Sequence, residues 1–412
     1  MAGNEEMIAY REALEIIRRE ASRLQLATEK VSLSSISGRV CAGDVVSPLS
    51  IPPFDNAAMD GFAVRSADFK GAAATLRAKS RMAAGDTVGN LEILPGECCE
   101  IMTGAPVPRG VDSIVPVEQT KRAGDMITFS APPQPGDHIR KAGSDFAKGA
   151  RIIGQGTLLG VRHVLPLAAL GIGKVEVYEK PRIAFIPTGR EITDRLDQAL
   201  EEGRIYNSNL PYAEAYLSGA GAEVLPQATI ADDPAQFQAT VKKLMGEGVH
   251  LIVSSGAVSA GSHDFIRSSL EEMGARILFH KVAIKPGKPV LFAILPGGTL
   301  YLGLPGNPVA TAAGLRFFVQ PLLEVLMRQQ LEKPFHARAK TPLSRKAGLR
   351  LFLKAKIEPS PDGGLEVEFL DGQESYKTAP FFSMNGWAVI PEDRQVIDIN
   401  DVIEVFPLGL FS

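Results

Sequence analysis

The chain has 412 residues, of which 45% are hydrophobic and 22% charged, a globular composition that excludes a disordered or fibrous protein. Because one hydrophobic core rarely grows beyond about 250–300 residues, we expect about two to four domains. The 44 basic and 47 acidic residues give a net charge of -3, and no block of lysines and arginines indicates binding to nucleic acid.

Targeting and redox features favour a cytoplasmic protein. The chain begins with the acidic stretch "MAGNEEM", which is not a signal peptide. The longest apolar run, "VLPLAALGIG", is much shorter than the roughly 20 residues of a membrane span. Three cysteines (Cys41, Cys98 and Cys99) are too few for a disulfide framework, and an adjacent pair is a poor metal site.

The hydrophobic pattern changes several times along the chain. Residues 5–24 carry apolar side chains every three or four positions, which predicts an amphipathic helix. Short β-like runs broken by Gly and Pro follow over 31–177 and predict β-rich domains. Over 180–328, apolar strands alternate with amphipathic helices, which indicates a mostly parallel sheet covered on both faces. From Glu332 the alternation is β-like again, typical of a small antiparallel barrel or sandwich.

Two strand ends of the α/β region have unusual loops, and ligands bind where the carboxyl ends of parallel strands meet. Thr188, Gly189 and Glu191 follow the strand 182–187 as either an ordinary glycine turn or part of a site. The stretch "SSGAVSAGSHD" at 254–264 exposes main-chain N–H groups that can form an anion-binding nest. Its candidate side chains are the hydroxyls of Ser254, Ser255 and Ser259, and Asp264, which is either a helix N-cap or a metal ligand.

Two further strand ends suggest anion binding. Lys285 and Lys288 flank the Pro-Gly turn of "IKPGKP", where an anion would hold both ammonium groups together; a stiff turn with surface lysines is the alternative. A P-loop is excluded because no Ser or Thr follows the lysine. In "LPGNP", Gly306 allows a tight turn, Asn307 can cap a helix, and Pro308 suits the first helical position. Helix N-termini favour anions, although this junction also has a purely structural interpretation.

Three carboxylates complete this predicted edge of the sheet. Asp232, after the expected strand 222–230, either caps the helix that follows or lies beside Glu191 and Asp264. Carboxylates next to lysines and exposed main-chain N–H groups suit a phosphate or oxyanion site assisted by Mg²⁺, which prefers oxygen ligands. The residues by themselves therefore predict an anion and divalent-metal site on an α/β domain.

Five blocks of sequence resemble the molybdopterin molybdenumtransferase family, which includes bacterial MoeA and the C-terminal domain of gephyrin. They are "IPPFDNAAMDGFAVRSAD", "CEIMTGAPVPRGVDSIVPVE", "SSGAVSAGSHDF", "VAIKPGKPVLF" and "LGLPGNPVA", and the match extends from about residue 5 to the C-terminus. The resemblance implies a homodimer of elongated four-domain subunits. It places an N-terminal helix (1–27) with the α/β domain, a linking domain (28–48 and 145–179), a β-rich domain (49–144), a molybdopterin-binding α/β domain (180–328) and a C-terminal β-barrel (329–412).

The resemblance also implies a reaction. Members of the family hydrolyse adenylylated molybdopterin, release AMP and insert molybdate into the pterin dithiolene with Mg²⁺ present, in a cleft that both subunits line. The enzyme that adenylylates molybdopterin is the implied upstream partner. By position, Asp60 and Thr103 match functional residues that reach the cleft from the β-rich half. The remaining matches are Glu191, Asp232 and Asp264 for Mg²⁺ or substrate; Lys285 and Lys288 for molybdate or phosphate; Ser254, Ser255, Gly256 and Ser259 for the pterin phosphate; and Pro305, Gly306, Asn307 and Pro308 for the "LPGNP" turn.

The chain departs from the family pattern at several of these positions. Arg190 stands where "TGDE" is usual, and it either pairs with a neighbouring carboxylate or replaces part of the charge of the metal. Ala257 and Ala260 alter the usual "SGGVSVG", and Ala257 adds a methyl group where positive φ is expected. His250 replaces an acid that often opens the next strand.

Two alternatives to an active transferase stay open. The first, which the changes at Arg190 and Ala257 motivate, is a paralogue that binds molybdopterin or molybdate without turnover, as a carrier or scaffold. The second is an enzyme that adenylylates molybdopterin, which would need only residues 180–328; the "DNAAMDG" block and the predicted barrel argue against it.

Overall fold

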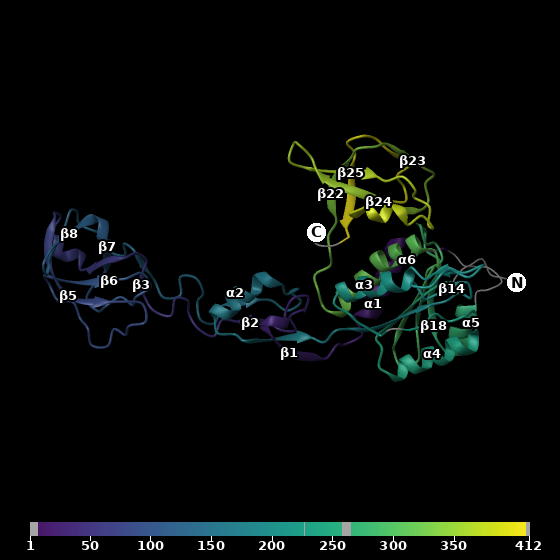
Figure 1. The fold of residues 1–412 in the computed structure, drawn as a ribbon, viewed down its shortest axis with the longest axis horizontal. Helices are drawn as coiled ribbons and strands as arrows, with labels where there is room; N and C mark the ends of the chain where they lie inside the picture. The colour runs from purple at the N-terminus through teal and green to yellow at the C-terminus, as the bar shows by residue number, and fades with distance from the viewer. Residues whose placement is uncertain (1–6, 226, 258–264, 409–412) are drawn as a thin grey trace.

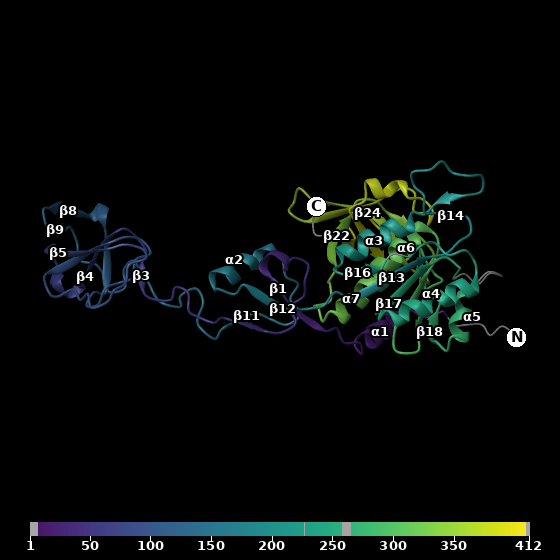
Figure 2. The ribbon, with the colours of Figure 1, turned by 60° about the horizontal axis from the view of Figure 1, so that its bottom comes forward.

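The structure, a computed structural model, describes residues 7–225, 227–257 and 265–408. The molecule is elongated: a β-rich domain forms one end, the α/β domain and the C-terminal barrel form the other, and a narrow linking region joins them (Figure 1). Two segments that are distant in sequence run through this linking region. A second view, turned by 60°, gives the same arrangement (Figure 2).

The β-rich domain contains a six-stranded mixed sheet in the order β7-β4-β6-β5-β9-β8, in which β5 and β6 run parallel. Apolar side chains alternate between its two faces and form a core on each. Its strands are β4 (Gly61–Val64), β5 (Ala74–Met82), β6 (Glu97–Ile101), β7 (Ser113–Pro116), β8 (Thr120–Ala123) and β9 (Met126–Phe129), with a short pair of β3 (Asn56–Ala57) and β10 (Ile139–Arg140).

The linking region is made of two antiparallel pairs and a helix. β1 (Thr28–Ser32) pairs with β12 (Lys174–Tyr178), and β2 (Val45–Val46) pairs with β11 (Arg151–Ile153). The helix α2 (Val161–Ala169) buries Leu167 in a small core. Both strand pairs join an early segment to a late one, so the β-rich domain is an insertion in the linking region.

The α/β domain has a six-stranded sheet in the order β16-β13-β17-β21-β20-β18. The sheet is mostly parallel, as the sequence predicts, but β20 runs antiparallel to both of its neighbours, β21 and β18. The reason is the connection from β20 to β21, a short turn that cannot contain a crossover helix. The strands are β13 (Arg182–Pro187), β16 (Glu223–Leu225), β17 (Leu251–Ser255), β18 (Arg276–His280), β20 (Leu291–Ile294) and β21 (Leu300–Leu304).

Helices cover both faces of this sheet, as the sequence predicts. α1 (Tyr10–Ala21), α3 (Asn209–Gly219), α6 (Pro308–Gly314) and α7 (Gln320–Leu326) contribute to the core on one face, and α4 (Pro234–Gly246) and α5 (Phe265–Glu272) to the core on the other. A π-helical turn, Leu315–Val319, joins α6 to α7. Among the described residues, the helix Pro308–Leu326 is long and apolar enough to cross a membrane, but 83% of its apolar window is buried inside the protein.

The C-terminal domain is a closed five-stranded barrel. β24 pairs with both β25 and β26, which closes the ring β24-β25-β22-β28-β26, and β19 (Ile284–Lys285) adds to β24 from the α/β domain. The rings of Phe317 and Phe352 stack at 3.9 Å across the boundary, so barrel and α/β domain share one core. The barrel strands are β22 (Phe335–Ala339), β24 (Arg350–Pro359), β25 (Leu365–Phe369), β26 (Gly386–Ile390) and β28 (Val402–Pro407), with a short pair of β23 (Leu343–Ser344) and β27 (Val396–Ile397).

Candidate functional site

The loops after β13, β17 and β21 meet backbone to backbone at one edge of the sheet. The N–H of Thr188 donates to the carbonyl of Ser255 at 2.8 Å, and the N–H of Gly256 donates to the carbonyl of Leu304 at 3.1 Å. A Cβ at Gly256, where φ is +98°, would lie 2.5 Å from the Thr188 carbonyl oxygen, and a Cβ at Gly306 would lie 3.3 Å from the Gly256 Cα. This close approach requires glycine at position 256.

The serines before this loop have buried hydroxyls. Ser254 shares a 2.5 Å hydrogen bond with the Tyr301 hydroxyl inside the sheet, and Ser255 accepts a 3.4 Å hydrogen bond from the Asn209 side chain. The described part of the loop therefore offers main chain to a ligand, not these two side chains. Ala257 has φ +50°, which confirms the positive φ expected there. Ser259, Ala260 and Asp264 lie outside the described residues.

The lysine turn lies against the start of α6. Lys285 and Lys288 are both exposed, and Gly287 between them, at φ +92°, would place a Cβ 3.6 Å from Ala310. The "LPGNP" turn is held by Thr311, whose hydroxyl donates to the Pro305 carbonyl at 2.7 Å. The two turns that the sequence singles out are thus neighbours, with both ammonium groups accessible to a ligand.

A loop of the barrel completes this edge. Pro308 occupies the first turn of α6 as predicted, and Asn307 occupies the N-cap position, but its side chain makes no capping hydrogen bond. The Asn307 side-chain amide instead donates to the Ser375 hydroxyl at 3.0 Å, and the N–H of Val309 donates to the Ser375 carbonyl at 3.1 Å. Sequence reasoning missed Ser375, because no local signal in a barrel loop indicates that it reaches this helix.

The acidic residues that the structure describes do not form a closed metal cage. Glu191 is exposed, with its carboxylate folded against Gly189, where a Cβ would lie 2.9 Å from Oε2. The cap of α4 is Asp233, which accepts from the N–H groups of Ala235 and Gln236, so the capping interpretation of Asp232 is wrong by one residue. Asp232 stays exposed. Within residues 7–225, 227–257 and 265–408, no three His, Cys, Asp or Glu side chains lie close enough to hold a metal.

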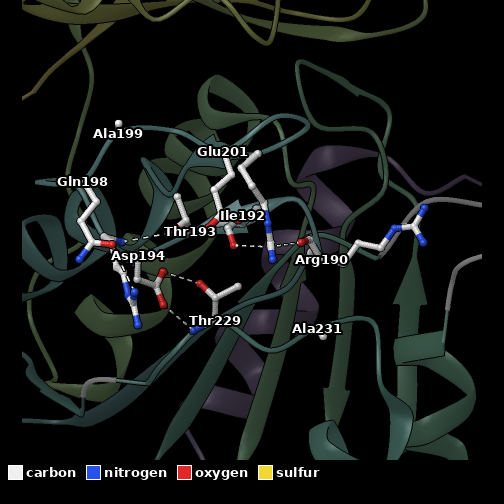
Figure 3. A pocket seen from close by; sticks show the side chains of 12 residues that line it. Arg190, Ile192, Thr193, Asp194, Gln198, Ala199, Glu201, Thr229 and Ala231 are labelled. Atoms are coloured by element: carbon white, nitrogen blue, oxygen red, sulfur yellow. Dashed lines mark hydrogen bonds between the residues drawn. The ribbon is translucent and has the colours of Figure 1, made fainter.

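A depression of about 480 Å³ opens beside the end of β13, under an excursion of the chain through the short pair β14 (Ile192–Thr193) and β15 (Ile205–Tyr206). Asp194 anchors this excursion by accepting hydrogen bonds from the Thr229 N–H at 2.9 Å and from the Thr229 hydroxyl (Figure 3). It also accepts a hydrogen bond from the Asn207 side chain at 2.8 Å. Burial raises the pKa of Asp194, but these donors outweigh it, so the pKa lies below its usual value.

Arg190 borders the depression mainly through its backbone. Its carbonyl accepts a hydrogen bond from Arg204, while its side chain points away from the other labelled residues (Figure 3). Among the residues that the structure describes, the guanidinium lies within 4 Å of no carboxylate. The sequence leaves two possibilities for Arg190: an ion pair with a neighbouring carboxylate, or partial replacement of the metal's charge. The structure does not show the ion pair with any described carboxylate.

Asp60 and Thr103 lie together in the β-rich domain. The Thr103 hydroxyl and N–H donate to the same carboxylate oxygen of Asp60 at 2.6 and 2.7 Å. These two bonds, the hydroxyl first, hold the pKa of Asp60 below its usual value. Within one subunit this pair is at the opposite end of the molecule from the strand-end loops, since the β-rich domain lies far from the α/β domain (Figure 1).

Comparison with known families assigns the whole architecture. Residues 8–171 match the MoeA N-terminal region (domain I and II), residues 184–325 match the probable molybdopterin binding domain, and residues 336–408 match the MoeA C-terminal region (domain IV). The "probable molybdopterin binding domain" contains the strand-end loops, the lysine turn and the depression described above.

Individual relatives agree over almost the full length. The chain is 35% identical to the molybdopterin molybdenumtransferase of Synechococcus elongatus, over 97% of this chain and 99% of the relative, and 33% identical to that of Haemophilus influenzae, over 93% and 94%. A crystal structure of the molybdopterin biosynthesis MoeA protein of Pyrococcus horikoshii superposes with a TM-score of 0.83 at 29% identity, over 98% of this chain and all of that one. The chain therefore belongs to the molybdopterin molybdenumtransferase family, whose members are transferases of molybdenum cofactor biosynthesis.

Proposed function

We propose that this protein inserts molybdate into adenylylated molybdopterin and releases AMP in a Mg²⁺-dependent reaction. The observation that carries the proposal is the contact between the two anion-favouring turns, in which Gly287 of the lysine turn lies against Ala310 behind the "LPGNP" turn. Lys285 and Lys288, which are both exposed, lie on either side of Gly287 in this turn. An oxyanion there would offset the repulsion between them, because like charges held together are stabilised by a shared counter-ion.

The residues of this edge would bind and orient the substrates. The main chain at Gly256 and Gly306 allows a phosphate or pterin to approach closely, while Lys285 and Lys288 would hold molybdate beside it. Positioning and charge neutralisation are the main needs of such a transfer. No Ser-His-Asp type of nucleophile is proposed.

A Mg²⁺ ion would neutralise charge between substrate phosphates and the protein. Glu191 and Asp232 are the exposed carboxylates that would hold it, with Asp264 as the third candidate in sequence. The described carboxylates alone are too few for a protein-only cage. They are enough for Mg²⁺, which usually binds through one or two carboxylates together with substrate phosphates and water.

The position of Asp60 and Thr103 supports a homodimer with composite sites. One subunit cannot bring this pair to its own strand-end loops in the described conformation (Figure 1). Helix α2 in the linking region exposes Val161 (82%) and Leu165 (79%) to solvent. Because large apolar side chains exposed on one helix are typical of an interface, this helix is the proposed dimer contact. A two-fold dimer through this helix would place the β-rich domain of one copy beside the α/β domain of the other.

The test uses purified protein with adenylylated molybdopterin, molybdate and Mg²⁺. The proposal predicts AMP release that depends on Mg²⁺, together with pterin-bound molybdenum in equal amount. The alternative is a carrier that binds molybdopterin without turnover; it predicts pterin binding without AMP release, and that result would exclude the transferase reaction. The adenylylating enzyme is the proposed source of substrate, and faster turnover with that enzyme present than with free substrate would support direct transfer.

A further inference from the structure

Lys354 is a fully buried lysine in the barrel. Its exposure is 0%, and among the described residues no carboxylate lies within 4 Å of its ammonium group. The ammonium instead donates hydrogen bonds to two main-chain carbonyls, of Glu374 at 3.2 Å and Lys377 at 2.9 Å. Lysine is almost never fully buried without a partner, because removing its charge from water is costly, so these two bonds must compensate.

The same loop is fastened to β24 from a second side. The Gln373 side chain accepts from the N–H of Lys354 at 3.0 Å and donates to the carbonyl of Lys354 at 2.9 Å. It also donates to the Leu370 carbonyl at 2.7 Å. Residues 370–377 are therefore held to Lys354 of β24 by five hydrogen bonds: two from the ammonium group, two with the Gln373 side chain and one from the Leu370 N–H to the Lys354 carbonyl at 3.0 Å.

The held loop carries Ser375, which lies between the carbonyls of Glu374 and Lys377. Ser375 is the residue that contacts both Asn307 and Val309 at the start of α6. The strand β24 also contacts the site directly, because its first residues pair with β19, placing Leu351 opposite Lys285. One barrel strand thus contacts the lysine turn at its beginning and, at Lys354, determines where Ser375 sits.

We propose that Lys354 is a positioning residue of the insertion reaction: it holds the 370–377 loop so that Ser375 fixes the "LPGNP" turn beside Lys285 and Lys288. This inference rests on the proposed function for the identity of the reaction. Lys354 acts through the loop and not on substrate, since its side chain has no exposed surface.

The test compares Lys354→Met with Lys356→Met. Lys356 lies on the same strand but is exposed and paired with Glu358 at 2.6 Å, so it is a matched control. We expect Lys354→Met to raise the amide exchange rate of residues 370–377 about tenfold and the KM for molybdate about tenfold, since lost hydrogen bonds from a charged donor correspond to about that factor. Lys356→Met should leave both unchanged.

Two further variants keep the test informative if Lys354→Met folds poorly. Gln373→Ala removes the hydrogen bonds between the Gln373 side chain and the main chain of Lys354, and Lys354→Arg keeps a positive charge and N–H donors at position 354. The first should raise the KM for molybdate, and the second should restore part of the loop protection. Unchanged loop exchange and unchanged KM in Lys354→Met, or in Gln373→Ala where that variant alone folds, would overturn the inference.

Failure of the proposed function would look different. An unmodified protein without insertion activity would refute the reaction, whereas the exchange measurement needs no turnover. If the unmodified protein is active and Lys354→Met lowers only thermal stability, with KM and loop exchange unchanged, the lysine is structural and the inference is wrong.

Discussion

Thr103 donates both its hydroxyl and its N–H to one oxygen of Asp60, and so joins two sequence motifs that are 43 residues apart. These two hydrogen bonds lower the pKa of Asp60, so the carboxylate stays ionised at a more acidic pH than an ordinary aspartate, although it is exposed to solvent. An oriented, charged carboxylate on an exposed loop, with little other structural reason for its orientation, suits contact with a substrate or a partner subunit.

Thr103→Val should weaken catalysis without unfolding the domain. The change removes the hydroxyl donor and keeps the N–H, so the pKa of Asp60 should rise toward its usual value. Because the ionised form is lost as pH falls, the acid limb of kcat/KM should move to higher pH. At neutral pH, where Asp60 stays ionised, the lost hydroxyl bond should lower the rate about tenfold by releasing the orientation of the carboxylate. Thr75→Val, which removes a hydroxyl pair with Thr128 in the same domain, is the control. An unchanged pH profile would contradict this role.

Gly256→Ala should disrupt the strand-end edge. The added Cβ would lie 2.5 Å from the Thr188 carbonyl oxygen, at a φ that disfavours side chains. We therefore expect the free energy of unfolding to fall by about 2 kcal/mol or more. Urea unfolding followed by fluorescence, with activity measured in parallel, checks both effects. Gly246→Ala, at the last residue of α4 with open space around its Cβ, should not destabilise the domain. Equal midpoints for both variants would show that the edge tolerates a side chain.

Arg190→Asp should change the need for Mg²⁺. Arg190 adjoins Glu191 in sequence and its guanidinium pairs with no described carboxylate, so its positive charge is not neutralised by one near the proposed metal site. Replacing it with an acid should lower the Mg²⁺ concentration at half-maximal activity severalfold. A Mg²⁺ titration of both proteins measures this, with Arg77→Gln in the β-rich domain as control. If the Mg²⁺ curves of Arg190→Asp and the unmodified protein coincide, Arg190 does not affect Mg²⁺ binding.

His250 should make stability fall in mild acid. Its Nδ1 accepts a 3.0 Å hydrogen bond from the Arg182 N–H, which requires a neutral ring. Burial first, and then the charge of Arg182, lower the pKa of His250 below its usual value. The unfolded chain therefore binds the proton more readily, so this contribution is complete above about pH 6.5 and is lost as pH falls through the folded pKa.

The variant His250→Asn separates this effect from general acid unfolding. An asparagine oxygen could still accept from the Arg182 N–H but does not titrate in this range. Its urea midpoint should change less than that of the unmodified protein between about pH 6.5 and 5. Parallel pH dependence in the two proteins would mean that His250 does not contribute.

Local chemistry decides which features the sequence could predict. The strand-end loops, Pro308 at the start of α6 and the positive φ at Ala257 follow from neighbouring residue types and spacing. The mostly parallel sheet is confirmed, but the reversed direction of β20 could not be predicted, because apolar runs alone do not give strand direction. The capping interpretation of Asp232, one of the two left open, is one residue too early, since either of two adjacent aspartates fits the pattern.

Contacts between domains could not be predicted in the same way. Ser375 reaches Asn307 only because the barrel closes and shares a core with the α/β domain, and Lys354 is buried only in that closed barrel. In sequence, Ser375 lies in an ordinary polar stretch between β-like runs, and Lys354 lies within a β-like run whose pattern does not indicate a buried charge. The proposed role of Asp60 and Thr103 likewise requires a second subunit, which the sequence of one chain does not place.

The most direct test of the account is complementation between two inactive variants. Asp60→Asn and Lys288→Met are each expected to abolish insertion, and random mixing of subunits makes about half of the dimers mixed. If each site takes Asp60 from one subunit and Lys288 from the other, a mixed dimer keeps one of its two sites, so the mixture should regain about a quarter of the unmodified activity. A mixture as inactive as either variant would contradict the composite site.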